Sequence, residues 1–222
     1  MAATRAQVAN VEALAAWMQE NAVPNIFNAV TYENSVLTAT DADENTVLEI
    51  NGGTGAASSG FFRAYRAENN ALGFALNLYP ISAGIEIIGC DNGFMIQSSV
   101  RNSSGAERLF AALFTKTNNN KPAIIFPETP PATTSGAARF TTGLHHVAFG
   151  DSATKATTKT FTPEDTNQTE LVPFLTNADL LTVSYCPNAF YIPSGQYYNA
   201  GMGLFEMEES AYITNGYWAI KV

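Results

Sequence analysis

The chain has 222 residues, a formal net charge of −9 and only 14% charged residues. This length fits one large domain or two small ones. The 11 Lys and Arg residues are scattered, which excludes nucleic acid as the expected partner because phosphate binding needs a basic surface. The most apolar window, residues 73–90, is interrupted by Asn77, Pro80 and Glu86, so we expect no membrane partner either. The N-terminus lacks the apolar core of a signal peptide, and we expect synthesis in a cytoplasm.

The N-terminal segment, residues 1–24, is predicted to form a helix from Thr4 to Asn21. Thr4 can cap its first turn, and Gln7 stands three residues later, as in a capping box. Pro24 prevents any continuation. Spacings of three and four residues define one apolar stripe with its flanks: Val8, Val11, Leu14, Ala15, Trp17 and Met18. This stripe packs either on the chain's own sheet or on a neighbouring subunit.

From residue 25 onwards the pattern changes to short apolar runs separated by turn residues. Hairpins are predicted around Asp91-Asn92-Gly93 and around the turn at residues 118–120. The residues 58–74 are ambiguous and could hold a short helix. The strand candidates are residues 35–40, 46–51, 84–90, 94–100, 108–117, 121–126, 144–150, 155–162, 180–186 and 189–193. Their regular spacing predicts a mainly β fold, with an antiparallel β-sandwich or barrel-like sheets and one N-terminal α-helix.

A segment rich in Pro, Thr and Ser, residues 126–138, interrupts this pattern. As a linker, it would divide the chain into two β-rich halves, residues 25–130 and 131–222. As a long loop, it would lie inside one domain. The sequence leaves both organisations open.

The C-terminal 20 residues predict a three-stranded meander. The segments "GLFEM", "AYIT" and "YWAIKV" are separated by short turns, and Asn215-Gly216 is a strong two-residue hairpin signal. That loop would place Ile213 opposite Trp218 and Ala211 opposite Ile220. One strongly apolar face would then be shared by Trp218, Ile220 and Val222. We expect the final strand to be internal to a sheet or covered by a partner.

The residues that could carry chemistry form no complete motif. Asp41, Asp43 and Asn45 alternate like the start of a calcium loop, but Thr46 and Gly52 replace the required Gly and Glu. An EF-hand is excluded, which leaves a looser Ca²⁺ site or a solvated turn. The Gly-rich residues 51–60 lack the Lys-Ser/Thr pair that a phosphate-binding loop needs.

The histidines and cysteines give no stronger signal. His145 and His146 are adjacent, so on a strand they point to opposite faces and cannot share one metal ion. They would matter for catalysis only if a hydrolase site assembled in the fold. Cys90 and Cys186 are either two buried thiols or a disulfide. We therefore predict no catalytic residue, no metal and no cofactor, and expect the protein not to be an enzyme.

Aromatic residues concentrate towards the C-terminus, and residues 188–203, "NAFYIPSGQYYNAGMG", are the stretch best suited to present them on a surface loop. Such rings fill cores, form protein interfaces or stack on sugars. Together with the N-terminal stripe they give the candidate interface residues Val8, Val11, Trp17, Met18, Phe190, Tyr191, Tyr197, Tyr198 and Trp218.

The ending "FYIPSGQYYNAGMGLFEMEESAYITNGYWAIKV", in a chain rich in Asn and Thr and poor in Lys, resembles small virion structural proteins of tailed bacteriophages and prophages. The resemblance lies mainly in the C-terminal quarter. It implies a non-enzymatic protein of the capsid, neck, tail or baseplate that assembles with copies of itself and with other virion proteins. It also implies that the protein is located in the virion. The alternative hypothesis is a β-sandwich carbohydrate-binding module that holds a glycan with its C-terminal aromatic loops.

Overall fold

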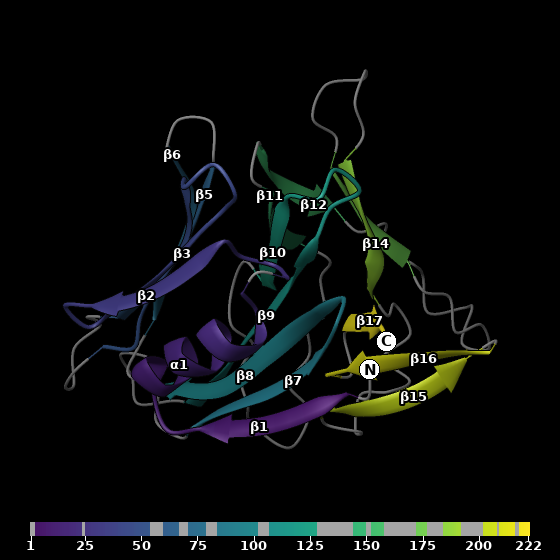
Figure 1. Cartoon of the computed structure of the whole chain (residues 1–222), viewed down its shortest axis with the longest axis horizontal. Coiled ribbons are helices and arrows are strands. Elements are labelled where there is room, and N and C mark those ends of the chain that lie inside the picture. The colour runs from purple at the N-terminus through teal and green to yellow at the C-terminus, as the bar shows by residue number, and fades with distance from the viewer. Residues whose placement is uncertain are drawn as a thin grey trace.

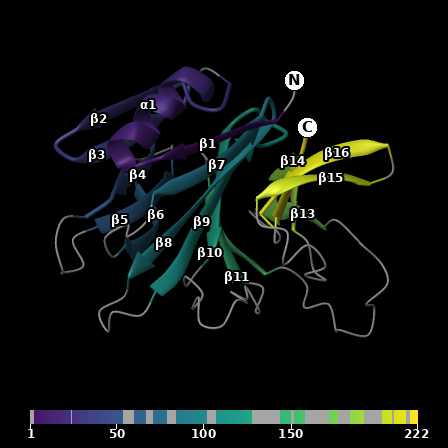
Figure 2. The ribbon, with the colours of Figure 1, turned by 90° about the horizontal axis from the view of Figure 1, so that it is seen from below.

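A computed structural model describes residues 3–23, 25–53, 60–66, 71–78, 84–101, 107–127, 144–149, 152–157, 172–176, 184–191, 202–207, 209–215 and 218–222. Within these residues one α-helix and three antiparallel sheets are present. The predicted fold class is therefore confirmed: the protein is mainly β, with one N-terminal helix and a C-terminal meander. The three sheets are stacked, with the central one between the other two (Figures 1 and 2).

The central sheet has seven strands. In spatial order they are β1 (Thr4–Val8), β7 (Ile85–Cys90), β8 (Gly93–Arg101), β9 (Glu107–Lys116), β10 (Pro122–Pro127), β11 (Leu144–Phe149) and β12 (Ser152–Thr157). The predicted hairpins around Asp91-Asn92-Gly93 and around residues 118–120 are confirmed as the β7–β8 and β9–β10 pairs.

An N-terminal sheet lies against one face of the central sheet, together with the helix α1 (Val11–Asn21). Its strands, again in spatial order, are β2 (Ala29–Glu33), β3 (Val36–Thr40), β4 (Thr46–Asn51), β5 (Gly60–Arg66) and β6 (Ala71–Leu78). The ambiguous residues 58–74 thus supply strands β5 and β6 in their described part, and no helix lies in that part.

A C-terminal sheet lies against the opposite face. Its spatial order is β13 (Val172–Thr176), β14 (Ser184–Tyr191), β17 (Trp218–Lys221), β16 (Ser210–Thr214) and β15 (Gly203–Met207). The last strand, β17, runs between β14 and β16, as predicted for a strand internal to a sheet. The two strands predicted at 180–186 and 189–193 are one continuous strand, β14, where they are described.

The central strands β7 to β10 have buried side chains on both faces of the sheet, and these supply two different cores. On β8 and β9, Phe94 and Phe114 point to the N-terminal sheet and helix, while Met95 and Leu113 point to the C-terminal sheet. The same alternation continues on β10, where Ile124 belongs to the first core. A strand that is covered on both sides reads as a continuous apolar run, which explains the unbroken run at residues 109–114.

The first core is dominated by phenylalanines. Phe114 stacks on Phe94 with ring centroids 4.6 Å apart and meets Phe27 edge-on at 6.0 Å. Phe62 of β5 lies 4.8 Å from Phe126 of β10 and 5.2 Å from Phe110 of β9. The contacts of Phe27 and Phe62 join the N-terminal part of the chain to the central sheet, because each pair takes one ring from each side.

The predicted helix start at Thr4 is wrong. Thr4–Val8 is the edge strand β1, which pairs antiparallel with β7 from Thr4 opposite Gly89 to Val8 opposite Ile85. The helix begins at Val11, because the Asn10 side chain caps it by accepting a hydrogen bond from the backbone N–H of Ala13 at 2.9 Å. Gly84 lets the chain approach β1 closely, since a Cβ there would lie 2.8 Å from the Val8 carbonyl oxygen.

The predicted register of the C-terminal hairpin is also wrong, by two residues. Ile213 lies opposite Ile220, not Trp218, and Thr214 lies opposite Ala219. Two side chains at the turn stabilise this longer loop. Asn215 Oδ1 accepts a hydrogen bond from the backbone N–H of Trp218 at 3.0 Å, and Thr214 Oγ1 donates one to the Trp218 carbonyl oxygen at 2.7 Å. A shift of two residues preserves the faces, so Trp218 and Ile220 still face the core.

The segment predicted to be either a linker or a long loop lies between two neighbouring strands in the sequence. β10 pairs with β11 across it, with Ile125 opposite Val147. Residues 128–143 lie outside the described part of the chain. The strand predicted at 155–162 begins earlier, at Ser152, and is described as far as Thr157. Chain from both sides of residue 130 therefore contributes to the central sheet.

Candidate interaction surface

The outer edges of the sheets are the places where this fold can add a further strand. The edge of β2 is met by the helix, because Gln19 Nε2 donates to the Val30 carbonyl oxygen at 2.7 Å. In the described residues, no strand pairs with the outer edge of β1 in the central sheet or of β15 in the C-terminal sheet. Unpaired N–H and C=O groups along such edges are a template for another chain.

β15 also carries an exposed apolar side chain. Leu204 is 59% exposed, and it is the exposed large hydrophobic residue among those whose side chains are described. Its cross-strand neighbour Ile213 is fully buried against the central sheet. Paired residues point to the same face of a sheet, so the core covers the inner strand β16 there but not the edge strand β15. Glu206, two residues further along β15, is exposed on that same face.

The edge strand belongs to a sheet that is firmly held at its centre. Asn92 Nδ2, in the β7–β8 turn, donates to the Lys221 carbonyl oxygen at 2.8 Å, and the Cys90 thiol contacts the same oxygen at 3.7 Å. The backbone N–H of Val222 donates to the Ala211 carbonyl oxygen at 2.8 Å. β15 is thus presented on a rigid support rather than on a free hairpin.

The interface residues predicted on the helix are placed as follows. Val11 and Met18 are buried in the first core, while Val8 and Trp17 are half-buried against it. Trp17 meets Phe94 edge-on at 5.2 Å. The apolar stripe therefore packs on the chain's own sheets. A partner that docks on α1 would meet its exposed side chains, Glu12, Ala16, Gln19, Glu20 and Asn21.

The C-terminal candidates are divided in the same way. Trp218 is fully buried in the second core, and Phe190 is half-buried with its ring edge-on to Tyr212 at 6.0 Å. Tyr191 belongs to β14, but its side chain lies outside the described part of the structure. Tyr197 and Tyr198, and with them the aromatic loop of the carbohydrate-binding alternative, also lie outside it. Contact of these residues with a partner stays a prediction.

A polar cluster on the outer face of the N-terminal sheet was not foreseen. Tyr65 donates a hydrogen bond to Glu49, and Arg63 lies 3.4 Å from the same carboxylate oxygen. The Arg63 guanidinium also sits 3.9 Å above the Phe61 ring. Burial, followed by the hydrogen bond and charge of Glu49, raises the pKa of Tyr65, so its hydroxyl stays a proton donor at neutral pH. The cluster ties β4 to β5 across the strands.

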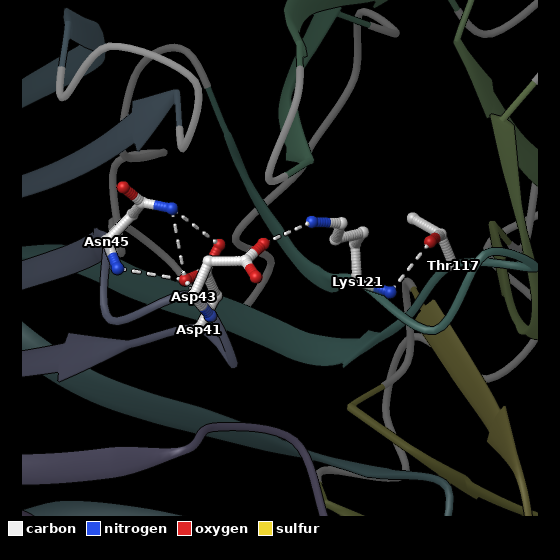
Figure 3. A network of polar contacts seen from close by, with 5 residues as sticks. All are labelled: Asp41, Asp43, Asn45, Thr117 and Lys121. Atoms are coloured by element: carbon white, nitrogen blue, oxygen red, sulfur yellow. Dashed lines mark hydrogen bonds and ion pairs between the residues drawn. The ribbon is translucent and has the colours of Figure 1, made fainter.

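Asp41, Asp43 and Asn45 lie in a turn that is stabilised by hydrogen bonds made within the turn itself (Figure 3). Asp41 is 1% exposed, and its Oδ1 accepts from the backbone N–H groups of Asp43 at 3.0 Å and Asn45 at 2.9 Å. Asp43 reaches out to Lys121 Nζ at 3.0 Å, which links the β3–β4 turn to the β9–β10 turn. Among the described residues, no group of three His, Cys, Asp or Glu side chains is placed to hold a metal ion.

Replacing the two aspartates should have very different effects on stability. Asp41→Ala is expected to lower the free energy of unfolding by about 2–3 kcal/mol, because the backbone N–H groups of Asp43 and Asn45 lose the buried carboxylate that accepts their hydrogen bonds. Asp43→Ala removes only an exposed ion pair and should cost less than about 0.5 kcal/mol. Urea unfolding of both variants measures the difference. Equal losses would show that the turn is held by something other than the Asp41 carboxylate.

Both cysteines are free thiols. Cys90 is half-buried and Cys186 is fully buried. Burial raises the pKa of each thiol, most strongly that of Cys186. A protonated thiol is a poor nucleophile, so the two residues behave as small apolar side chains at neutral pH. His145 and His146 lie in β11, and their side chains are outside the described part of the structure.

In the described part of the chain, no helix combines the length and apolarity needed to cross a bilayer. Comparison of the chain with protein-family models, with curated proteins and with solved structures gives no significant match.

Proposed function

We propose that this protein is a non-enzymatic structural subunit of a bacteriophage or prophage virion, and that it works by associating with copies of itself and with other virion proteins. The observation that supports association is Leu204, an exposed leucine on β15, whose outer edge pairs with no strand in the described part of the chain. Folded proteins usually protect such edges with charges, prolines or a covering element. An exposed apolar side chain on such an edge favours a function in which a second chain covers it.

Two further features support an assembly role. Only 14% of the residues are charged, which suits a subunit whose surface is partly covered by neighbours. The C-terminal sheet is held to the central sheet by a buried core and by the Asn92–Lys221 hydrogen bond. A rigid edge loses little conformational entropy when a partner strand is added, so association through it is favoured. The proposal that the assembly is a virion is based on the resemblance of the C-terminal sequence to virion structural proteins.

Self-association is tested by size-exclusion chromatography with light scattering over a range of protein concentrations. The wild-type chain is expected to form a discrete oligomer, which Leu204→Ser weakens and the apolar control Leu204→Met preserves. A monomer at every concentration would contradict self-association.

The location is tested separately, by mass spectrometry of particles purified by density gradient from cells that encode the chain. Peptides of this protein should be found at levels comparable with those of other particle proteins. Their absence from intact particles would contradict the virion role even if the purified protein oligomerises.

A further inference from the structure

Two of the edge strands in the described structure, β1 and β15, carry opposite charges. β1, with the sequence TRAQV, has Arg5 as its single charged side chain. β15, with the sequence GLFEM, has Glu206 as its single charged side chain. Both side chains are exposed, and both strands are five residues long. The edges therefore match in length and are complementary in charge.

The charges disfavour pairing of an edge with its own kind. Two β15 strands that pair antiparallel about Phe205 bring the two copies of Glu206 into diagonal positions on one face. Two β1 strands that pair about Ala6 do the same with Arg5. Like charges at such positions repel, whereas one β1 and one β15 attract each other. The edge charges thus select between partners instead of only blocking association.

We propose that β15 of one subunit adds to the outer edge of β1 of a second copy of this chain, in an antiparallel pair that places Glu206 opposite Arg5. In this register Leu204 lies opposite Gln7, and Phe205 lies opposite Ala6. The exposed leucine is then covered by the aliphatic part of Gln7, a side chain that is exposed on β1. The central sheet of one subunit continues into the C-terminal sheet of the next.

The pairing is heterologous, because each subunit uses two different surfaces. Such contacts repeat from subunit to subunit and build a ring or a filament rather than a closed two-fold dimer. This inference rests on the proposed function and names the surfaces through which the subunits associate.

The test is a charge exchange in the full-length protein, measured by sedimentation or light scattering. Arg5→Glu and Glu206→Arg are each expected to weaken self-association by about tenfold, since each turns an attraction into a repulsion. The double variant restores the pair and should return to within about threefold of wild type. Glu33→Arg makes the same charge change at an exposed site on the N-terminal sheet and should leave association unchanged.

Mixing the two single variants separates this pairing from any self-pairing of edges. In an equimolar mixture, the carboxylate introduced by Arg5→Glu meets the guanidinium introduced by Glu206→Arg, and the native Arg5 and Glu206 meet at the next contact. The mixture is therefore expected to associate about as strongly as wild type. Circular dichroism confirms that each variant is folded, and the milder changes Arg5→Gln and Glu206→Gln provide a second pair, with about threefold losses expected.

Two outcomes would overturn the inference. If wild type oligomerises but neither the double variant nor the mixture recovers association, the subunits meet elsewhere, and the proposed assembly function stands without this pairing. If wild type is a monomer at all concentrations, this pairing and the self-association in the proposed function both fail.

Discussion

Trp218→Ala is expected to lower the free energy of unfolding by about 3–5 kcal/mol, as for other large aromatic side chains removed from a core. Trp218 is fully buried between the C-terminal and central sheets. Both of its backbone polar groups are held by side chains, because its N–H donates to Asn215 Oδ1 and its carbonyl oxygen accepts from Thr214 Oγ1. The surrounding strands cannot collapse into the space it leaves, so the variant bears the cost of a cavity as well as lost apolar burial.

The matched control is Trp17→Ala, at the other tryptophan of the chain. Trp17 is half-buried and contacts Phe94 edge-on, so its removal is expected to cost about 1–2 kcal/mol. Urea unfolding, followed by circular dichroism at protein concentrations where the chain is monomeric, compares the two. A loss at Trp218 that appears only in the oligomer would contradict its placement in the core and would make it an interface residue.

The hairpins could be predicted from the sequence because their information is local. Asp91-Asn92-Gly93 combines turn residues with apolar strands on either side, and all the paired residues lie between Glu86 and Gln97. The C-terminal meander was predicted for the same reason. Its register was not, because side-chain hydrogen bonds of Thr214 and Asn215 stabilise a longer loop than the Asn-Gly pair indicates.

The arrangement of the sheets depends on contacts between residues far apart in the chain. Thr4–Val8 has the local features of a capped helix start, but it gains a full set of strand partners from Ile85–Cys90. Tertiary pairing of this kind overrides a weak local preference. In the same way, the apolar run of β9 indicates burial on both faces only once the sheets on each side are known.

The candidate interaction surface was missed for a related reason. Large aromatic residues were predicted to form the interface, yet Trp218 and most of the described phenylalanines fill the two cores. Leu204 and Arg5 carry no local signal, because an edge is a property of strand order and not of the strand's own sequence. Only the spatial order of the strands shows that β1 and β15 are at edges.

Gly93→Ala, which adds a single methyl group, has the second-largest expected effect, a loss of about 2–5 kcal/mol in the free energy of unfolding. Gly93 has a φ of +155°, a conformation that residues with a Cβ rarely adopt. A Cβ there would overlap the Phe114 carbonyl oxygen and lie 3.1 Å from Ile220 Cδ1 and 3.2 Å from Thr115 Cβ. The backbone cannot easily yield, because Thr115 Oγ1 donates to the Asn92 carbonyl oxygen at 2.6 Å.

Gly89→Ala is the matched control, one strand away in the same hairpin. Its Cβ would lie 3.2 Å from Phe94 Cβ and 3.3 Å from Trp17 Cη2, and the ring can shift by a few tenths of an ångström, so about 1 kcal/mol is expected. Thermal and urea unfolding measure both variants. Equal losses would show that overpacking of the central sheet alone sets the cost. A larger loss at Gly93 would show that stability is most sensitive to packing where β8, β9 and β17 meet. This contact holds the C-terminal sheet, and with it the β15 edge, to the rest of the fold.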